Sequence, residues 1–303
     1  METIQQKENE MKNMRKLSMF IVAMAVFVLP LQGAPVLVYD WDADGDADTA
    51  GDDTWESEIS TTETRTWTFD KNASPVNAGS SWFGKAYHFG GGAQDPVFAA
   101  TGSFSNSDLK DGDNDASFEF WLKPDDLSGN EGIFNTGGDG YGIGFALNGN
   151  MLRVHSKSSE ALSVNQEYDL SNEGGYDSGT DTFNDFIQIV GVADEANSEF
   201  HLYVNGDKKD TQTNVDSGWH SGGAGAHLGK SEISDFDPDK EGGDYGNFEG
   251  KIARVRFYAD AMSANEVESA YNTVIPEPAS LGLFGIVCAA LWFARRKYRG
   301  IQS

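Results

Sequence analysis

Apolar residues recur at alternate positions in short stretches along the middle of the chain. Residues 117–123 are the clearest case, because Phe118, Phe120 and Leu122 fall on one face and the residues between them fall on the other. Side chains alternate along a strand with a period of two, so this stretch predicts a strand that is buried on one side. The other predicted strands are 36–39, 64–69, 86–89, 96–99, 141–147, 151–155, 186–192, 200–204 and 251–258.

Tight turns connect some of these strands. Asn148-Gly149 lies between two predicted strands, and Asn205-Gly206 follows another. Asn-Gly is a strong signal for a two-residue hairpin, since both residues tolerate a positive φ. The remainder of 49–81 is polar and predicts long loops. Many short strands joined by such turns predict an all-β, antiparallel sandwich.

One short helix is predicted after the last strand. The segment 263–266, Ser-Ala-Asn-Glu, has the spacing of a capping box, in which serine and glutamate satisfy free backbone N–H groups. Val267, Ala270 and Tyr271 then line one apolar face. Pro276 ends the helix, because proline cannot continue the backbone hydrogen-bond pattern.

The N-terminus has the layout of a secretory signal peptide. Basic residues at 12–16 precede an apolar run at 17–31, and the small residues Gly33 and Ala34 follow. We expect 1–34 to be removed on export. A retained N-terminal anchor is the alternative.

The chain ends in three signals in a fixed order: a proline-rich break, an uncharged apolar segment and a basic cluster. They are Pro276, Glu277 and Pro278, then 279–294, then Arg295 and Arg296. As a helix, 279–294 rises about 24 Å, against a hydrocarbon core of about 30 Å. We expect a transmembrane segment whose basic end stays in the cytoplasm, which leaves the preceding domain on the other side of the membrane.

This tail, 274–303, resembles the PEP-CTERM sorting signal of Gram-negative bacteria. The resemblance implies processing by an exosortase and delivery to the cell surface or to an extracellular polysaccharide matrix. An ordinary single-pass anchor is the alternative. Both place the region 35–273, long enough for one large domain, outside the cytoplasm.

The charge of the chain narrows the choice of partners. The sequence has 48 acidic and 22 basic residues, a formal net charge of −26. Such a charge argues against nucleic acid or an anionic lipid surface as a partner of the domain. The one cysteine, Cys288, lies in the apolar tail, so the domain has no internal disulfide.

Acidic residues are densest after the first predicted strand. Alternating carboxylates there are Asp40, Asp42, Asp44, Asp46 and Asp48. With Gly45 to permit a sharp turn, they suit an oxygen-ligand calcium loop. The twelfth position of such a loop is Gly51, and no helix pattern flanks it, so a complete EF-hand is not predicted. We expect either a looser calcium loop or a solvated acidic turn.

The order of segments at 117–124, 200–206 and 248–258, followed by the Ser-x-x-Glu helix, is similar to the laminin-G-like, concanavalin A-like jelly roll. Residues 86–90 resemble its early strand. The resemblance implies a jelly-roll sandwich over most of 36–272, a fold that serves lectins, adhesion modules and glycan-cleaving enzymes alike. Family members often carry an acidic residue where this chain has Ala253, which counts against a rim calcium at that position.

Catalytic motifs are missing from the sequence. A glucanase of this fold is expected to carry a Glu-x-Asp-x-x-Glu strand, because retaining hydrolysis needs two carboxylates about 5 Å apart. Glu232 and Asp235 come nearest to that spacing, in a predicted loop. No His-Glu-x-x-His or Gly-x-Ser-x-Gly motif occurs. We therefore expect no enzyme activity.

Sugar binding requires aromatic faces for stacking, together with amides or carboxylates. Trp82, Trp219 and Tyr245 lie in polar, glycine-rich surroundings and are predicted to form an exposed platform. We expect a secreted or surface-anchored module that binds glycan or another matrix component. A glycan-cleaving enzyme of the same fold and a purely structural acidic matrix protein are the alternatives.

Overall fold

A computed structural model describes residues 34–45, 54–60, 66–69, 74–90, 115–136, 142–157, 162–215, 226–229 and 245–275. Several predicted features lie outside these residues: the signal peptide up to Gly33, the strand at 96–99 and the sorting tail from Pro276. Among the described residues, no helix has the length and apolar character needed to cross a membrane. The predicted segment 279–294 is not among them.

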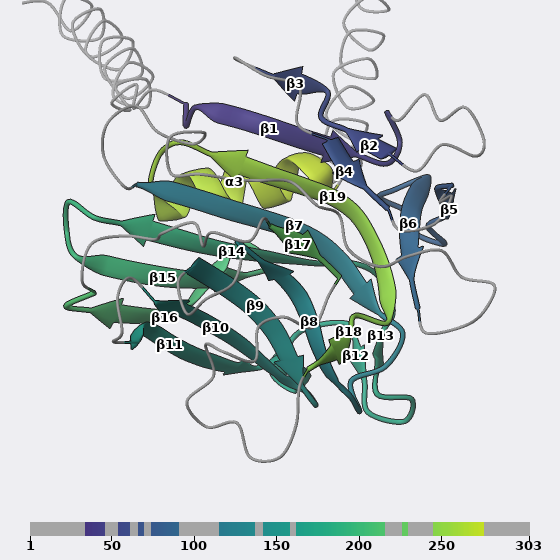
Figure 1. Cartoon of the computed structure of the whole chain (residues 1–303). Helices are drawn as coiled ribbons and strands as arrows, with labels where there is room; N and C mark the ends of the chain where they lie inside the picture. Colours follow the sequence, from purple (N-terminus) through teal and green to yellow (C-terminus); the bar gives the residue numbers. More distant parts are fainter. Residues whose placement is uncertain are drawn as a thin grey trace, which may run out of the picture. The chain divides into compact units, whose positions relative to one another are not determined.

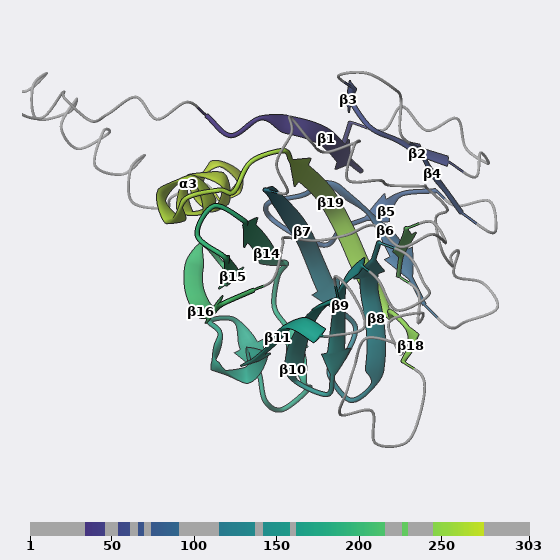
Figure 2. The same cartoon turned by 60° about the vertical axis from the view of Figure 1, so that its left-hand side comes forward.

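Two sheets, antiparallel except for one short parallel pair, make up the domain within the described residues (Figures 1 and 2). The larger has nine strands, seven of them in the order β16 (Asp207–Thr213), β15 (Glu199–Val204), β14 (Ile187–Asp194), β7 (Ala116–Pro124), β19 (Gly250–Tyr258), β1 (Leu37–Asp42) and β3 (Ile59–Ser60). Its remaining strands are β6 (Lys85–Phe89), paired with the start of β19, and β5 (Val76–Asn77), paired with β6.

The smaller sheet has six strands. Five follow the order β11 (Leu162–Asp169), β10 (Met151–Lys157), β9 (Gly142–Asn148), β8 (Asn130–Asn135) and β17 (His227–Leu228). The sixth, β18 (Gly246–Asn247), pairs with the start of β8 in parallel. Two short ribbons pair β2 (Thr54–Glu56) with β4 (Thr66–Thr68), and β12 (Tyr176–Asp177) with β13 (Thr182–Phe183). A 3₁₀ turn, η1 (Leu170–Asn172), follows β11.

Aromatic side chains fill the space between the two sheets. Phe118 and Phe120 of β7 pack on Phe257 and Phe134 from the two sheets, with ring centroids 5.2 and 5.1 Å apart. Trp41 of β1 is fully buried in the same cluster. Aromatic contacts of this kind add to the free energy gained by apolar burial. The antiparallel sandwich predicted from alternation is therefore confirmed.

Helix α3 (Ala264–Val274) packs on the outer face of the nine-stranded sheet, the face directed away from the smaller sheet (Figure 2). Ser263 donates two hydrogen bonds to the Glu266 carboxylate, both 2.7 Å, and the predicted capping box is present. Val267 is buried, and the Tyr271 ring stacks on Trp121 at 5.8 Å. The helix ends before Pro276, as predicted.

The prediction that β7 is buried on one face only is wrong, because its outer face is buried as well. Residues between the inward phenylalanines were expected to face solvent, yet Glu119 and Trp121 are 0 % exposed. The outer face is covered because Trp121 packs with Phe83, Phe186 and Ala253, and Tyr271 of α3 lies against the same cluster. The alternation of apolar residues in one strand does not show whether another segment of the chain packs on its second face.

Several strands were not predicted. β2 and β3 lie in a stretch predicted to be loop, and β8, β11 and β16 had no predicted counterpart. β16 has the sequence DKKDTQT, and none of its residues is buried. It forms because it extends the hairpin from β15 across Asn205 and Gly206, whose φ values of 53° and 81° suit the predicted tight turn.

Candidate functional site

The acidic segment predicted as a calcium loop begins inside a strand. β1 continues through Asp42, because its ladder with β19 runs on to the pair Asp42 and Arg254. Trp41 points into the core, and Asp40 and Asp42 therefore point to the outer face. The prediction of a loop starting at Asp40 is wrong by three residues.

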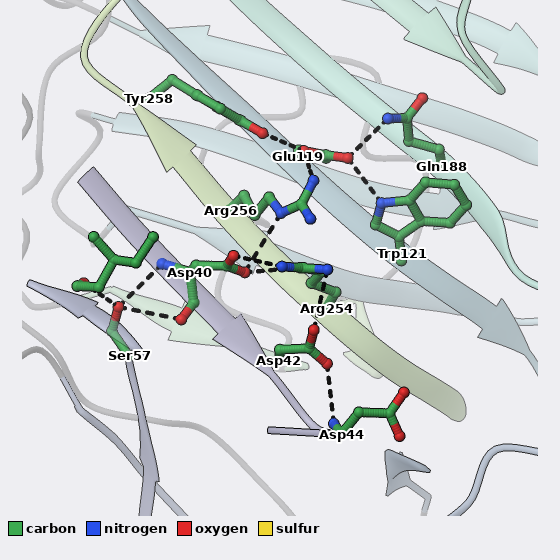
Figure 3. Close-up of polar contacts among 11 residues, drawn as sticks. Asp40, Asp42, Asp44, Ser57, Glu119, Trp121, Gln188, Arg254, Arg256 and Tyr258 are labelled. Atoms are coloured by element: carbon green, nitrogen blue, oxygen red, sulfur yellow. Dashed lines mark hydrogen bonds and ion pairs between the residues drawn. The ribbon is translucent and has the colours of Figure 1, made fainter. Parts of the chain in front are cut away.

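The described aspartates are held by other parts of the protein (Figure 3). Arg254 donates two hydrogen bonds to the Asp40 carboxylate, at 2.8 and 2.6 Å, and lies 3.0 Å from Asp42. Asp44 accepts hydrogen bonds from the backbone N–H groups of Gly84 and Lys85, at 3.0 and 2.6 Å. These contacts fix β1 to β19 and to the start of β6.

The calcium prediction is not tested by this arrangement. No group of three or more His, Cys, Asp or Glu side chains among the described residues could hold a metal ion. Asp46 and Asp48 lie outside those residues. Calcium binding by the acidic segment stays a prediction.

The buried Glu119 joins the aspartates and arginines on the outer face of the sheet (Figure 3). We call this group the ion-pair network; it comprises Asp40, Asp42, Glu119, Arg254, Arg256 and Tyr258. Trp121 Nε1 and Gln188 Nε2 each donate to Glu119 Oε1 at 2.8 Å, and the Tyr258 hydroxyl donates to Oε2 at 2.7 Å. Arg256 lies 3.4 Å from the same carboxylate. Burial, followed by the charge of Glu119, raises the pKa of Tyr258, which keeps its hydroxyl protonated as a donor.

The ion-pair network is built to stabilise the sheet. Both oxygens of Glu119 are occupied by protein donors, and Arg254 and Arg256 are committed to carboxylates. This network was not predicted, although alternate residues of 117–123 and 251–258 carry the charged groups that form it. Only the pairing of the two strands brings opposite charges together.

The predicted aromatic platform is not formed by its described members. Tyr245 is 5 % exposed and packs on Ala146, so the expected exposure is wrong. Trp82 is half-buried, with its ring edge against Trp121 at 6.3 Å. Trp219 lies outside the described residues. Glycine-rich neighbours predict a loop, but they do not determine the direction of its side chains.

A polar cavity of about 410 Å³ lies where β18 pairs with β8. We call it the β8–β18 cavity; its lining residues are Asp126, Ser128, Gly129, Asn130, Glu131, Gly246, Asn247 and Glu249. Its volume is within the range of small-ligand sites, ~300–1,000 Å³. Asn130 and Glu249 are exposed at its wall, and Asn247 is half-buried. No residue of this cavity was predicted to form a site.

Glu131 is the buried acid of the β8–β18 cavity. It is 7 % exposed, and one carboxylate oxygen accepts a hydrogen bond from the Glu249 N–H at 3.1 Å. Burial raises the pKa of Glu131 to about 7, and the charges of Glu249, Asp126 and Asp125 act in the same direction. A Cβ at Gly129 would lie 2.8 Å from the other Glu131 oxygen, so glycine leaves room for the carboxylate.

Stability should depend on pH through Glu131. Between the ordinary glutamate pKa of 4.5 and about 7, the folded protein keeps a proton that the unfolded chain releases. The contribution of this residue to stability therefore falls as pH rises through that window and stays low above it. We expect Glu131→Gln to stabilise the protein more at pH 8 than at pH 5, by about 1–2 kcal/mol.

Denaturant unfolding at the two pH values measures this effect. Glu56→Gln is the control, because Glu56 is exposed on β2. An equal gain for both variants, or no dependence on pH for Glu131→Gln, would show that Glu131 is ionised without cost.

A second cavity, of about 380 Å³, lies beside α3 and includes Glu173, Asn205 and Tyr271. Its acid, Glu173, is half-buried and already has a cationic partner, since Lys209 Nζ lies 2.8 Å from the Glu173 carboxylate. The hydroxyl of Tyr168 and the amide of Asn205 also donate to Glu173, at 2.7 and 2.9 Å. This carboxylate is committed to protein groups, in contrast to Glu131.

Comparison with known families gives two matches. Residues 98–268, more than half of the chain, match the concanavalin A-like lectin/glucanases superfamily. Residues 274–297 match the PEP-CTERM protein-sorting motif. No curated protein matches the sequence.

Solved structures support the fold. One similar structure is that of botulinum neurotoxin type C, whose cell entry is described as dependent on interaction with two ganglioside molecules. Its TM-score is 0.54 and its sequence identity is 14 %, with 79 % of this chain and 51 % of that chain covered. The botulinum neurotoxin type G receptor binding domain has a TM-score of 0.52 and 12 % identity, covering 78 % and 51 %. This chain thus spans about half the length of either.

A carbohydrate-binding module of the Ruminococcus gnavus IT-sialidase, CBM40 bound to α2,3-sialyllactose, has a TM-score of 0.44 and 12 % identity, covering 61 % of this chain and 96 % of that one. At such identities the similarity concerns the fold alone.

Proposed function

This chain belongs to the concanavalin A-like lectin/glucanases superfamily and carries a PEP-CTERM protein-sorting motif. On that basis we propose that it is an exported, non-catalytic module. We propose further that it binds glycan at the cell surface or in the surrounding matrix. The sorting motif implies handling by exosortase-type machinery. The ligand site that we propose is the β8–β18 cavity.

The chemistry of the cavity wall carries this proposal. Its side chains supply two amides, three carboxylates and one hydroxyl. Sugar hydroxyls both donate and accept, and amide and carboxylate groups are suited to bind them. Asn130 and Glu249 reach solvent, whereas the acids of the ion-pair network are enclosed by arginine and tyrosine.

A glycan array probed with the full chain, purified in mild detergent, tests the proposal. We expect saturable binding to a subset of glycans, and loss of that binding in a variant that combines Asn247→Ala with Glu249→Gln. Glu56→Gln serves as the control for the loss of one surface charge. Binding that survives in the double variant would place the site elsewhere, and no binding to any glycan would favour a purely structural acidic protein.

One observation favours glycan cleavage as a second candidate. Glu131, with a pKa of about 7, has the property of a general acid, and Glu249 and Asp126 line the same cavity. Release of reducing sugar from a polysaccharide panel, abolished by Glu131→Gln, would establish this activity. Absence of turnover on glycans that the array shows to bind would favour the binding module.

A further inference from the structure

We propose, resting on the proposed glycan-binding function, that the ligand of the β8–β18 cavity is a glycan with free primary amines, that is, hexosamine residues without N-acetyl groups. The ammonium group of such a sugar would lie beside Glu131 and Glu249. Its hydroxyls would bind the amides of Asn130 and Asn247.

The charge of the cavity selects this class of ligand. Its described lining residues include Asp126, Glu131 and Glu249, but no lysine, arginine or histidine. A carboxylated sugar entering such a site meets like charges, which is an effective means of rejection. A positively charged sugar is attracted, and the formal charge of −26 extends this attraction beyond the cavity.

Glu131 differs from the other buried carboxylates among the described residues. Those are Asp40 and Glu119, and each lies within ion-pair distance of an arginine. The charges that act on Glu131 are those of Glu249, Asp126 and Asp125, all negative. A carboxylate buried without a countercharge is costly, so a cation delivered by a ligand gains more here than at an exposed acid.

Of the three acids that line the cavity, Glu131 and Glu249 are the two that are available to bind the ligand, because Asp126 is engaged by Ser128. Asp126 accepts hydrogen bonds from the Ser128 N–H and hydroxyl, at 2.8 and 2.6 Å, which lower the pKa of Asp126 and keep it ionised in its own turn. Glu249 is exposed and lies between β18 and β19, directly before Gly250. Its backbone N–H fixes the Glu131 carboxylate, so the two acids share one wall.

Calorimetric titration of the full chain in mild detergent, at pH 6 and near-physiological ionic strength, tests the inference, because at this pH the sugar amine is charged and Glu131 carries a proton before the ligand binds. The probes are a glucosamine tetramer, the matched N-acetylglucosamine tetramer, sialyllactose and a short poly-lysine. We expect the glucosamine tetramer to bind about tenfold or more tightly than its acetylated form, because only the free amine forms a charged hydrogen bond. Sialyllactose should not bind.

Two substitutions locate the effect. Glu131→Gln removes the charge of the buried acid, and Glu249→Gln removes the charge of the exposed one, while each keeps the shape of the side chain. Each substitution should remove most of the preference for the free amine. Glu56→Gln should leave it unchanged. Because a cation favours the ionised form of Glu131, binding should release protons, so the apparent enthalpy should vary with the buffer for the unchanged protein and not for Glu131→Gln.

The outcomes separate this inference from the function on which it rests. Tight binding of the acetylated or sialylated probe that is lost in Glu249→Gln would overturn the amine preference and keep the glycan site. The inference would also be overturned if poly-lysine bound as tightly as the glucosamine tetramer does, or if Glu56→Gln lost as much of the amine preference as the site variants. Either result would show general attraction of cations to an acidic surface. No binding by any of these three sugars would overturn the inference, and the glycan-binding function falls only if the array shows no binding either.

Discussion

Replacing Glu119 with alanine should lower the free energy of unfolding by about 3–5 kcal/mol, because it leaves three donors without an acceptor and removes one of the two carboxylates beside Arg256. Glu119 is 0 % exposed and accepts from Trp121, Gln188 and Tyr258 at 2.7–2.8 Å, with Arg256 at 3.4 Å. Denaturant unfolding followed by tryptophan fluorescence measures the loss.

Glu119→Gln is the matched control. It keeps an oxygen that can accept a hydrogen bond but removes the negative charge opposite Arg256. We expect a smaller loss of stability than for alanine. A cost below about 1 kcal/mol for Glu119→Ala, which is the range of an exposed ion pair, would mean that water replaces the carboxylate and that the ion-pair network does not stabilise the sheet.

Replacing Gly250 with alanine should cost about 3 kcal/mol or more. Gly250 begins β19 with φ of 154°, where side chains are rarely accommodated. A Cβ there would lie 2.5 Å from the Lys123 carbonyl oxygen and 2.8 Å from the Pro124 Cα. Both are backbone atoms of β7, so relief requires the two strands to separate.

Gly174 provides the control for Gly250. A Cβ at Gly174 meets no atom within 4 Å, and its φ is not in the positive region. Gly174→Ala should be neutral or slightly stabilising, through reduced entropy of the unfolded chain. Melting curves of both variants test the pair. Similar small shifts for both would show that the start of β19 adjusts without cost.

Both predictions concern β19, the strand on which the nine-stranded sheet depends. One edge of β19 pairs with β7 along its length, and the other pairs first with β6 and then with β1. The register with β7 shifts between Ile252 and Arg254, so Ala253 is an extra residue in the ladder. Such a bulge redirects the following side chains, and it brings Arg254 to Asp40.

Sequence alone was sufficient for the elements whose signal is local. Alternation gave β7, a run of apolar residues gave β19, the Asn205-Gly206 signal gave the tight turn after β15, and the Ser263 capping box gave α3. The resemblance to concanavalin A-like jelly rolls is confirmed, and so is the sorting motif. The strands, the turn and the capping box each depend on residues a few positions apart, whose conformation depends on near neighbours. The family resemblance depends on the order of several such segments along the chain.

Only the tertiary structure decided what the polar residues do. Asp40 looked like a calcium ligand, but its partner Arg254 is 214 positions away. Tyr245 looked exposed, but Ala146 of β9 covers it. The β8–β18 cavity joins 126–131 to 246–249 through a parallel pairing that no local pattern announces. A side chain's periodicity fixes its face, whereas strand register fixes what lies opposite, and register is set by the packing of the whole sandwich.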